Sequence, residues 1–167
     1  LAVEEVPGVL EELRAVSDDW LTRHAGAEKG FSLGFFAADY MVRFRVAVIE
    51  QEGRIVAFAN LWEGPQHMEL SLDLMRYDAR APKEVMEALL VHVMLWGKSE
   101  GYRRLMLGMA PLSGFERSPV APLWSRLGSF LFEHGGPFYN FQGLREYKEK
   151  FHPEWEPKYL VYRGGFR

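Results

Sequence analysis

A β-hairpin pattern is the feature that most constrains the fold of this 167-residue chain. Two runs of strand-forming residues, 43–51 and 54–62, are separated only by Glu52 and Gly53. A two-residue connection containing glycine is typical of a tight hairpin turn, because glycine readily adopts the positive φ angles that such turns need. The second run, RIVAFANLW, is apolar at both alternating sets of positions, which predicts a central strand buried on both faces.

A third strand is predicted over 69–76, where side chains should alternate between two faces. The apolar face is expected to hold Leu70, Leu72 and Leu74, and the polar face Glu69, Ser71 and Asp73. Such a polar face is often the solvated side of an antiparallel sheet, but it can also line a cleft and hold a cationic amine. The buried character of the preceding strand and the position of Arg76 at the end of this one favour a cleft.

The remaining patterns predict helices that alternate with short strands. Helices are expected at 1–21, 84–100, 123–133 and 144–151, and strands at 104–108 and 158–163. An antiparallel hairpin followed by crossover connections predicts an α/β (α+β) fold with a mixed, mostly antiparallel sheet flanked by helices. Acyltransferases of the N-acetyltransferase (GNAT) type share this order of elements.

Coenzyme A enzymes of that type need a glycine-containing turn where the third strand meets the long helix, because its N–H groups hold the pyrophosphate. The corresponding segment, MRYDARAPK over 75–83, contains no glycine. The chain has no cysteine, no GxSxG motif and no close histidine pair, which argues against a covalent acyl-enzyme and a metal site. Direct transfer without a cofactor is therefore expected.

Three residues outside the polar face are further candidates. Arg76 could clamp a phosphate or a carboxylate, or it could pair with Asp73 or Asp78. Lys148 has no acidic residue three or four positions away, so it could reach into a cleft and bind an anion, or its stem could cover apolar surface. Tyr40 precedes the first strand, and a tyrosine is usually a core or interface residue with a satisfied hydroxyl.

Charge and hydropathy restrict the partners. The net charge of −3 disfavours extended contact with a nucleic-acid backbone and leaves contact with a few phosphates open. No apolar run reaches the roughly 18 residues that a membrane-spanning helix needs. The chain begins at Leu1 without a signal or transit pattern, so we expect a fragment of a longer chain. Within it we expect one lobe over 1–167, with leading helices and a loop at 1–30 and a core at 31–167.

Two long segments of the chain resemble one enzyme family. Residues 73–116 and 138–162 are similar to two blocks of the phosphatidylglycerol lysyltransferases, also called multiple peptide resistance factors, and EKGFSLGFF upstream also fits. The pieces LWGK, LGMAPLSG and LREYKEKFHPEWEPKYLVY are long and unusual, which makes the resemblance specific. It covers most of the chain and implies the second acetyltransferase-like lobe of a C-terminal catalytic domain.

The resemblance implies a reaction and its partners. A lysyl or alanyl group would move from aminoacyl-tRNA to the glycerol hydroxyl of phosphatidylglycerol, at the cytoplasmic side of the cell membrane, in a protein linked to antimicrobial peptide resistance. A first catalytic lobe and a membrane-embedded part would complete the enzyme. The alternatives are an acyl-coenzyme A-dependent N-acyltransferase and a non-catalytic lobe that recruits tRNA or a protein partner.

The resemblance also implies site residues. An Asp-x-x-Arg pair, an upstream tyrosine and a lysine in the closing helix correspond here to Asp73, Arg76, Tyr40 and Lys148. We therefore predict Asp73, Arg76 and Lys148 as catalytic residues. The predicted substrate-binding residues are Tyr40, Glu69 and Ser71, with Glu69 as the nearest carboxylate for the second ammonium of a lysyl group.

Overall fold

The computed structural model describes residues 1–24, 35–110 and 141–158. The chain divides into two compact units, Leu1–Gly108 and Met109–Arg167, which are described separately below. The expected single lobe over 1–167 stays a prediction. The expected helix at 123–133 lies outside the described residues, as does the expected last strand beyond Lys158.

The predicted hairpin is confirmed. Strands β1 (Arg45–Gln51) and β2 (Arg54–Glu63) pair antiparallel, and the turn residues Glu52 and Gly53 have φ angles of 52° and 72°. Two successive positive φ angles give the turn a twist that matches the twist of the paired strands. Residues 55–61 of β2 are buried, which confirms the predicted central strand.

The sheet has the order β1-β2-β3-β4 and is mixed. After the short 3-10 helix η2 (Pro65–His67), β3 (Leu70–Tyr77) pairs antiparallel with β2. Helix α3 (Val85–Ser99) then crosses over to β4 (Leu105–Met106), which pairs parallel with β3. Gly101 has a φ of 85° and follows α3 at the position where glycine commonly ends a helix.

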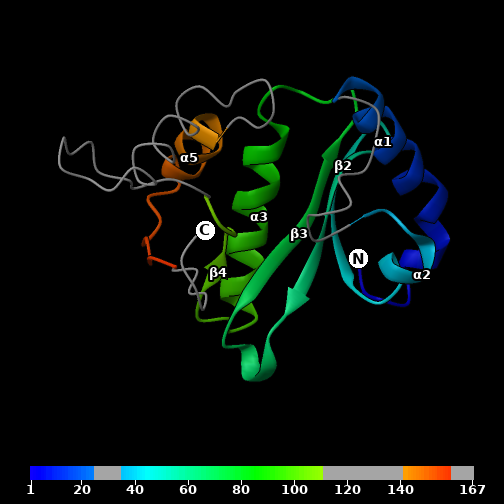
Figure 1. The fold of residues 1–167 in the computed structure, drawn as a ribbon. Helices are drawn as coiled ribbons and strands as arrows, with labels where there is room; N and C mark the ends of the chain where they lie inside the picture. The colour runs from blue at the N-terminus through cyan, green and yellow to red at the C-terminus, as the bar shows by residue number, and fades with distance from the viewer. Residues whose placement is uncertain (25–34, 111–140, 159–167) are drawn as a thin grey trace, which may run out of the picture. The chain divides into compact units, whose positions relative to one another are not determined.

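Helices cover both faces of the sheet (Figure 1). The 3-10 helix η1 (Val6–Val9), α1 (Leu10–Arg23) and α2 (Ala38–Met41) lie on one side, here called the α1 face, and α3 lies on the other, the α3 face. One buried cluster joins α1 and α2 to the sheet: Val6, Leu13, Val16, Met41, Val46, Ile55, Phe58 and Leu74. Two smaller clusters lie on the α3 face and include Val85 and Val93 of α3.

The alternation of side chains between the two faces of the sheet is interrupted in the middle of β3. One residue of β2, Asn60, lies opposite two residues of β3, Asp73 and Leu74. Such a bulge breaks the alternation of side chains. Leu70 and Leu72 therefore pack on the α3 face, whereas Leu74 belongs to the cluster on the α1 face. The prediction that the three leucines share one face is wrong for Leu74.

Helix α5 (Phe141–Glu149) is the described element of the second unit. It begins three residues earlier than predicted, and His152, just beyond it, has a φ of 47°. Arg145 and Glu149, four positions apart in α5, form an ion pair at 2.8 Å. In the described part of the chain, no helix combines the length and the hydropathy that crossing a membrane requires.

Candidate functional site

A short hydrogen bond joins α2 to the polar face of β3. The Tyr40 hydroxyl donates to Oδ2 of Asp73 at 2.5 Å, and the indole N–H of Trp62 donates to the Tyr40 oxygen at 3.2 Å. The one-turn helix α2 is held in place because Met41 is fully buried in the cluster on the α1 face. Three side chains from three elements are thus linked by two consecutive hydrogen bonds that end at the half-buried carboxylate of Asp73.

In this pair of hydrogen bonds, Tyr40 donates its hydroxyl proton to Asp73 and does not act as a base. Burial raises the pKa of Tyr40, and the hydrogen bond to Asp73 raises it further, against a lowering by the Trp62 N–H. The phenol therefore keeps its proton at neutral pH. It orients the Asp73 carboxylate, which is the group of this pair able to hold an ammonium ion or accept a proton.

Arg76 lies on the same face as Asp73 because the bulge falls between them. Its side chain is buried, its guanidinium lies 4.4 Å from the ring centre of Trp20, and one of its N–H groups points to the Ser17 hydroxyl at 3.5 Å. Without the bulge, residues three positions apart on a strand would point to opposite faces. The result is a fixed positive charge roughly 10 Å along the strand from the carboxylate.

The other two predicted residues of the polar face differ in position. Ser71 is half-buried and lies opposite Trp62 in the register, beside the Tyr40–Asp73 pair. Glu69 is exposed and precedes β3, where its carbonyl accepts the Gly64 N–H at 2.8 Å. At the usual rise of a strand, Glu69 lies roughly 13 Å from Asp73. The structure thus brings Ser71 toward the pair and leaves Glu69 apart from it.

Lys148 is buried within the second unit. It is 7 % exposed, and its ammonium donates to the Met109 carbonyl at 2.7 Å. This geometry differs from that of a lysine whose ammonium reaches solvent. Burial lowers the pKa of Lys148 to about 8. The catalytic role of Lys148 stays a prediction.

The backbone N–H groups of the turn before α3 are hydrogen-bonded to carboxylates of this same chain. Asp19 accepts the Ala79 N–H at 2.8 Å, and Asp78 accepts the N–H groups of Arg80 and Ala81 at 2.8 and 3.1 Å. Burial alone would raise the pKa of Asp78, but the hydrogen bonds and charge of Arg80 lower it overall. Three consecutive N–H groups are therefore occupied by anionic side chains where a coenzyme A pyrophosphate would need them.

Among residues 1–24, 35–110 and 141–158, no three His, Asp or Glu side chains gather closely enough to hold a metal ion. The described side chains of the site offer a carboxylate, a phenol, an arginine and polar neighbours.

Comparison with known proteins identifies the family. The family model described as "Phosphatidylglycerol lysyltransferase, C-terminal" matches residues 1–162. The chain belongs to this family. The phosphatidylglycerol lysyltransferase of Bacillus subtilis (strain 168) is 45% identical over 156 residues, which cover 92% of this chain and 18% of the relative.

Solved structures agree with this family. The structure of L-PGS from Bacillus licheniformis matches with a TM-score of 0.71 and 46% identity, covering 89% of this chain and 44% of that chain. The ribosomal-protein-alanine N-acetyltransferase of Brucella melitensis matches with a TM-score of 0.52 and 13% identity, over 98% of this chain and 96% of that one. The second likeness concerns the fold alone and confirms the predicted acetyltransferase-like fold. The chain thus spans less than half the length of its matched family relatives.

For this member of the phosphatidylglycerol lysyltransferase family, sequence reasoning overlooked two residues of the site. Asn60 and Trp62 lie within the apolar run of β2, and an asparagine in such a run is itself a signal of a buried polar role. Asn60 is fully buried, and its side-chain carbonyl accepts the Leu74 N–H at 2.7 Å. Asn60 therefore holds the bulge that brings Asp73 and Arg76 to one face.

Replacing Asn60 with Leu is expected to destabilise this chain by about 1–3 kcal/mol, because the buried Leu74 N–H loses its acceptor. The free energy of unfolding in urea measures the effect. Gln51→Leu, which alters an exposed amide at the end of β1, serves as the comparison and should change stability by no more than about 0.5 kcal/mol. Equal stability of Asn60→Leu and the parent chain would contradict the assigned role.

Proposed function

We propose that this chain is the aminoacyl-transfer lobe of a phosphatidylglycerol aminoacyltransferase. In the whole enzyme a lysyl or alanyl group moves from tRNA to the glycerol hydroxyl of the lipid. The observation that carries the proposal is the Tyr40–Asp73 hydrogen bond, which orients a carboxylate on the face that also holds the buried Arg76. Membership in the lysyltransferase family supports it.

The proposed reaction is a transesterification. The lipid hydroxyl oxygen attacks the ester carbonyl, the bond from that carbon to the tRNA ribose oxygen breaks, and the hydroxyl proton ends on the ribose oxygen. Asp73 holds the α-ammonium of the aminoacyl group or carries the proton between the two oxygens. Arg76 and Lys148 supply positive charge for phosphate groups and for the developing oxyanion.

Lipid analysis tests this proposal directly. Cells that lack aminoacylated phosphatidylglycerol and express the full-length protein should accumulate lysyl- or alanyl-phosphatidylglycerol, detected by mass spectrometry. Cells that express the full-length Asp73→Asn variant provide the control and should accumulate little of either lipid. Absence of both products with the parent protein, at normal expression, would exclude the proposed activity.

The rival enzyme class is an acyl-coenzyme A-dependent N-acyltransferase. The carboxylates of Asp19 and Asp78 occupy the N–H groups of the turn before α3 and would repel a pyrophosphate. We therefore expect isothermal titration of this chain with acetyl-coenzyme A to give no binding tighter than about 1 mM. Micromolar binding would favour the rival class.

We further propose that the lobe works at the cytoplasmic side of the cell membrane. It would be held there by the membrane-embedded part and the first catalytic lobe of the longer protein. The net charge of −3 agrees with this arrangement, because it would weakly oppose direct adsorption to an anionic lipid surface. Aminoacyl-tRNA would then meet this lobe through a few local contacts.

A further inference from the structure

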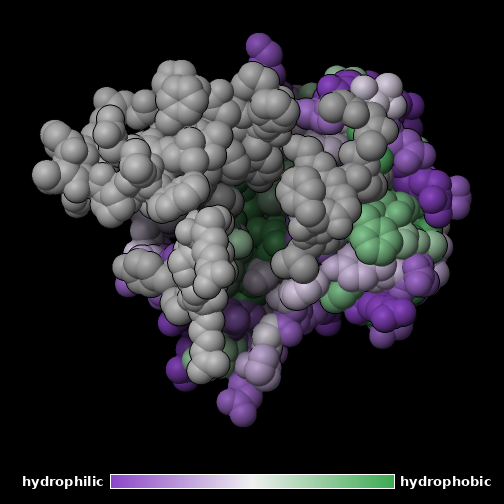
Figure 2. All heavy atoms as spheres, in the orientation of Figure 1, coloured by the Kyte–Doolittle hydropathy of each residue, from purple (hydrophilic) through white to green (hydrophobic). Residues whose placement is uncertain are grey.

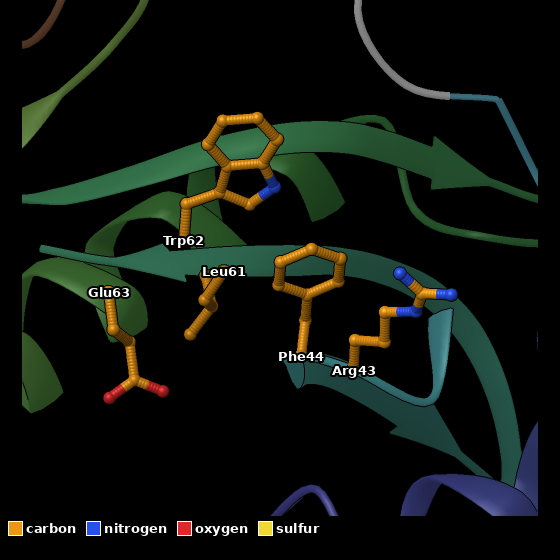
Figure 3. Close-up of a pocket in the computed structure, with 5 residues that line it drawn as sticks. All are labelled: Arg43, Phe44, Leu61, Trp62 and Glu63. Atoms are coloured by element: carbon orange, nitrogen blue, oxygen red, sulfur yellow. The ribbon is translucent and has the colours of Figure 1, made fainter. Parts of the chain in front are cut away.

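A pocket of about 310 Å³ lies at the end of the β1–β2 ladder (Figure 3). Its lining residues are Arg43, Phe44, Leu61, Trp62 and Glu63. The ladder begins with Arg45 opposite Leu61, and β2 continues for two further residues. The pocket is therefore formed where β2 extends past its partner strand, and its volume is at the lower end of the range for small-ligand sites.

Aromatic rings dominate the pocket and its surroundings. The rings of Phe44 and Trp62 are nearly parallel, at 11° with centres 5.9 Å apart, and Tyr40 meets Phe44 edge-on at 4.8 Å. Phe35 stacks on Tyr40 and is 58% exposed, and Trp62 is 40% exposed. Figure 2 shows hydrophobic surface exposed next to α2. Clustered exposed aromatic rings are typical of a binding surface.

This pocket is linked directly to the proposed site. The Trp62 ring lines the pocket while its N–H donates to Tyr40, and Tyr40 donates to Asp73. If Asp73 holds the α-ammonium of the aminoacyl group, the nucleoside that carries this group must lie close by, because only the ester and the ribose separate the amine from the base. The base is thus expected near Trp62, which only the Tyr40 side chain separates from Asp73.

We propose that the Phe44–Trp62 pocket binds the base of the terminal adenosine of aminoacyl-tRNA. This inference rests on the proposed function and names the part of the substrate that the pocket recognises. Single-stranded RNA ends are commonly bound by stacking their bases on aromatic rings. A base can contact both rings, which line the same pocket, and Phe44 can be changed without removing the Trp62 N–H that donates to Tyr40.

The charges around the pocket suit a nucleotide. Arg43 is exposed at its edge, oriented by a 2.8 Å hydrogen bond from its Nε to the Asp39 carbonyl, and can contact a phosphate. The carboxylate of Glu63 is paired with Arg45 at 3.1 Å and accepts the Tyr102 hydroxyl at 2.6 Å, so its charge is partly balanced. The phosphate of phosphatidylglycerol could use the same arginine. We favour the nucleoside because aromatic rings line the side of the pocket that is linked through Tyr40 to Asp73.

The test compares two non-hydrolysable inhibitors in the transfer assay of the full-length enzyme. Both carry the aminoacyl group as an amide, one on 3′-amino-3′-deoxyadenosine and the other on the same sugar without a base. We expect the adenosine compound to inhibit the parent enzyme at least about 10-fold better. In Phe44→Leu this advantage should shrink to less than about 2-fold, and in Phe44→Tyr it should persist because the ring remains.

Controls separate the possible outcomes. Leu95→Ala alters an exposed leucine of α3 and should leave transfer and inhibition unchanged.

The inference is overturned if Phe44→Leu has the parent melting temperature and keeps the full advantage, or if the parent enzyme does not distinguish the inhibitors. It is also overturned if Phe44→Leu raises KM for phosphatidylglycerol vesicles and not for charged tRNA, which would indicate a lipid occupant. Failure of the parent enzyme to transfer any aminoacyl group would instead refute the proposed function.

Discussion

Replacing Asp73 with Asn is expected to lower aminoacyl transfer by about 10²- to 10⁴-fold, the range attributed to one acid–base group. The amide cannot accept a proton from the lipid hydroxyl, and it cannot neutralise the α-ammonium of the aminoacyl group. Its oxygen can still accept the Tyr40 hydroxyl, so the geometry of the pair should persist. The measurement is kcat for transfer from charged tRNA to phosphatidylglycerol by the full-length enzyme, together with the melting temperature of this chain.

Two further variants make this prediction specific. Asp39→Asn removes an exposed carboxylate next to Tyr40 in α2 and should leave kcat unchanged. Tyr40→Phe removes the donor that orients Asp73 and should lower kcat less than Asp73→Asn does. Full activity of Asp73→Asn would support the non-catalytic recruiting lobe, whereas a parallel loss of melting temperature would make Asp73 a structural residue.

Replacing Lys148 with Ala is expected to reduce transfer by orders of magnitude, because a desolvated ammonium stabilises anionic charge far more than an exposed one does. Since burial lowers the pKa of Lys148 to about 8, the parent activity should fall as pH rises through about 8. Lys148→Arg should recover part of the activity and lose this decline, because a guanidinium stays charged. The pH profile of kcat from pH 6 to about 10 measures both effects.

Burial of Lys148 should also make the free energy of unfolding depend on pH. Between about 8 and the ordinary lysine pKa of 10.5, the unfolded chain binds a proton at Lys148 that the folded chain does not. The free energy of unfolding should therefore rise with pH across this window, and Lys148→Ala should abolish that rise. Lys150→Ala, which alters an exposed lysine just beyond the same helix, should keep it. Loss of melting temperature together with activity in Lys148→Ala would show a structural role.

Several elements were predictable because their signals are local. The hairpin turn at Glu52 and Gly53, the stop of α3 before Gly101 and the ion pair within α5 each depend on residues close together in the chain. The missing glycine in the turn after β3 already argued against a coenzyme A cradle. The carboxylates that occupy its N–H groups could not be foreseen in full, since Asp19 lies 60 residues before its partner Ala79.

The features of the candidate site likewise fall into those that the sequence predicts and those that depend on tertiary structure. The sequence by itself determined a strand with a polar face, and its resemblance to the lysyltransferases pointed to Asp73 and Arg76. Only the tertiary structure placed them on one face, because the register between β2 and β3 leaves Asn60 opposite two residues. Likewise only folding brings the Tyr40 hydroxyl to Asp73, 33 positions away, and removes Lys148 from water. Side-chain alternation is a property of one strand, whereas bulges, long-range hydrogen bonds and burial arise only when separate elements pack together.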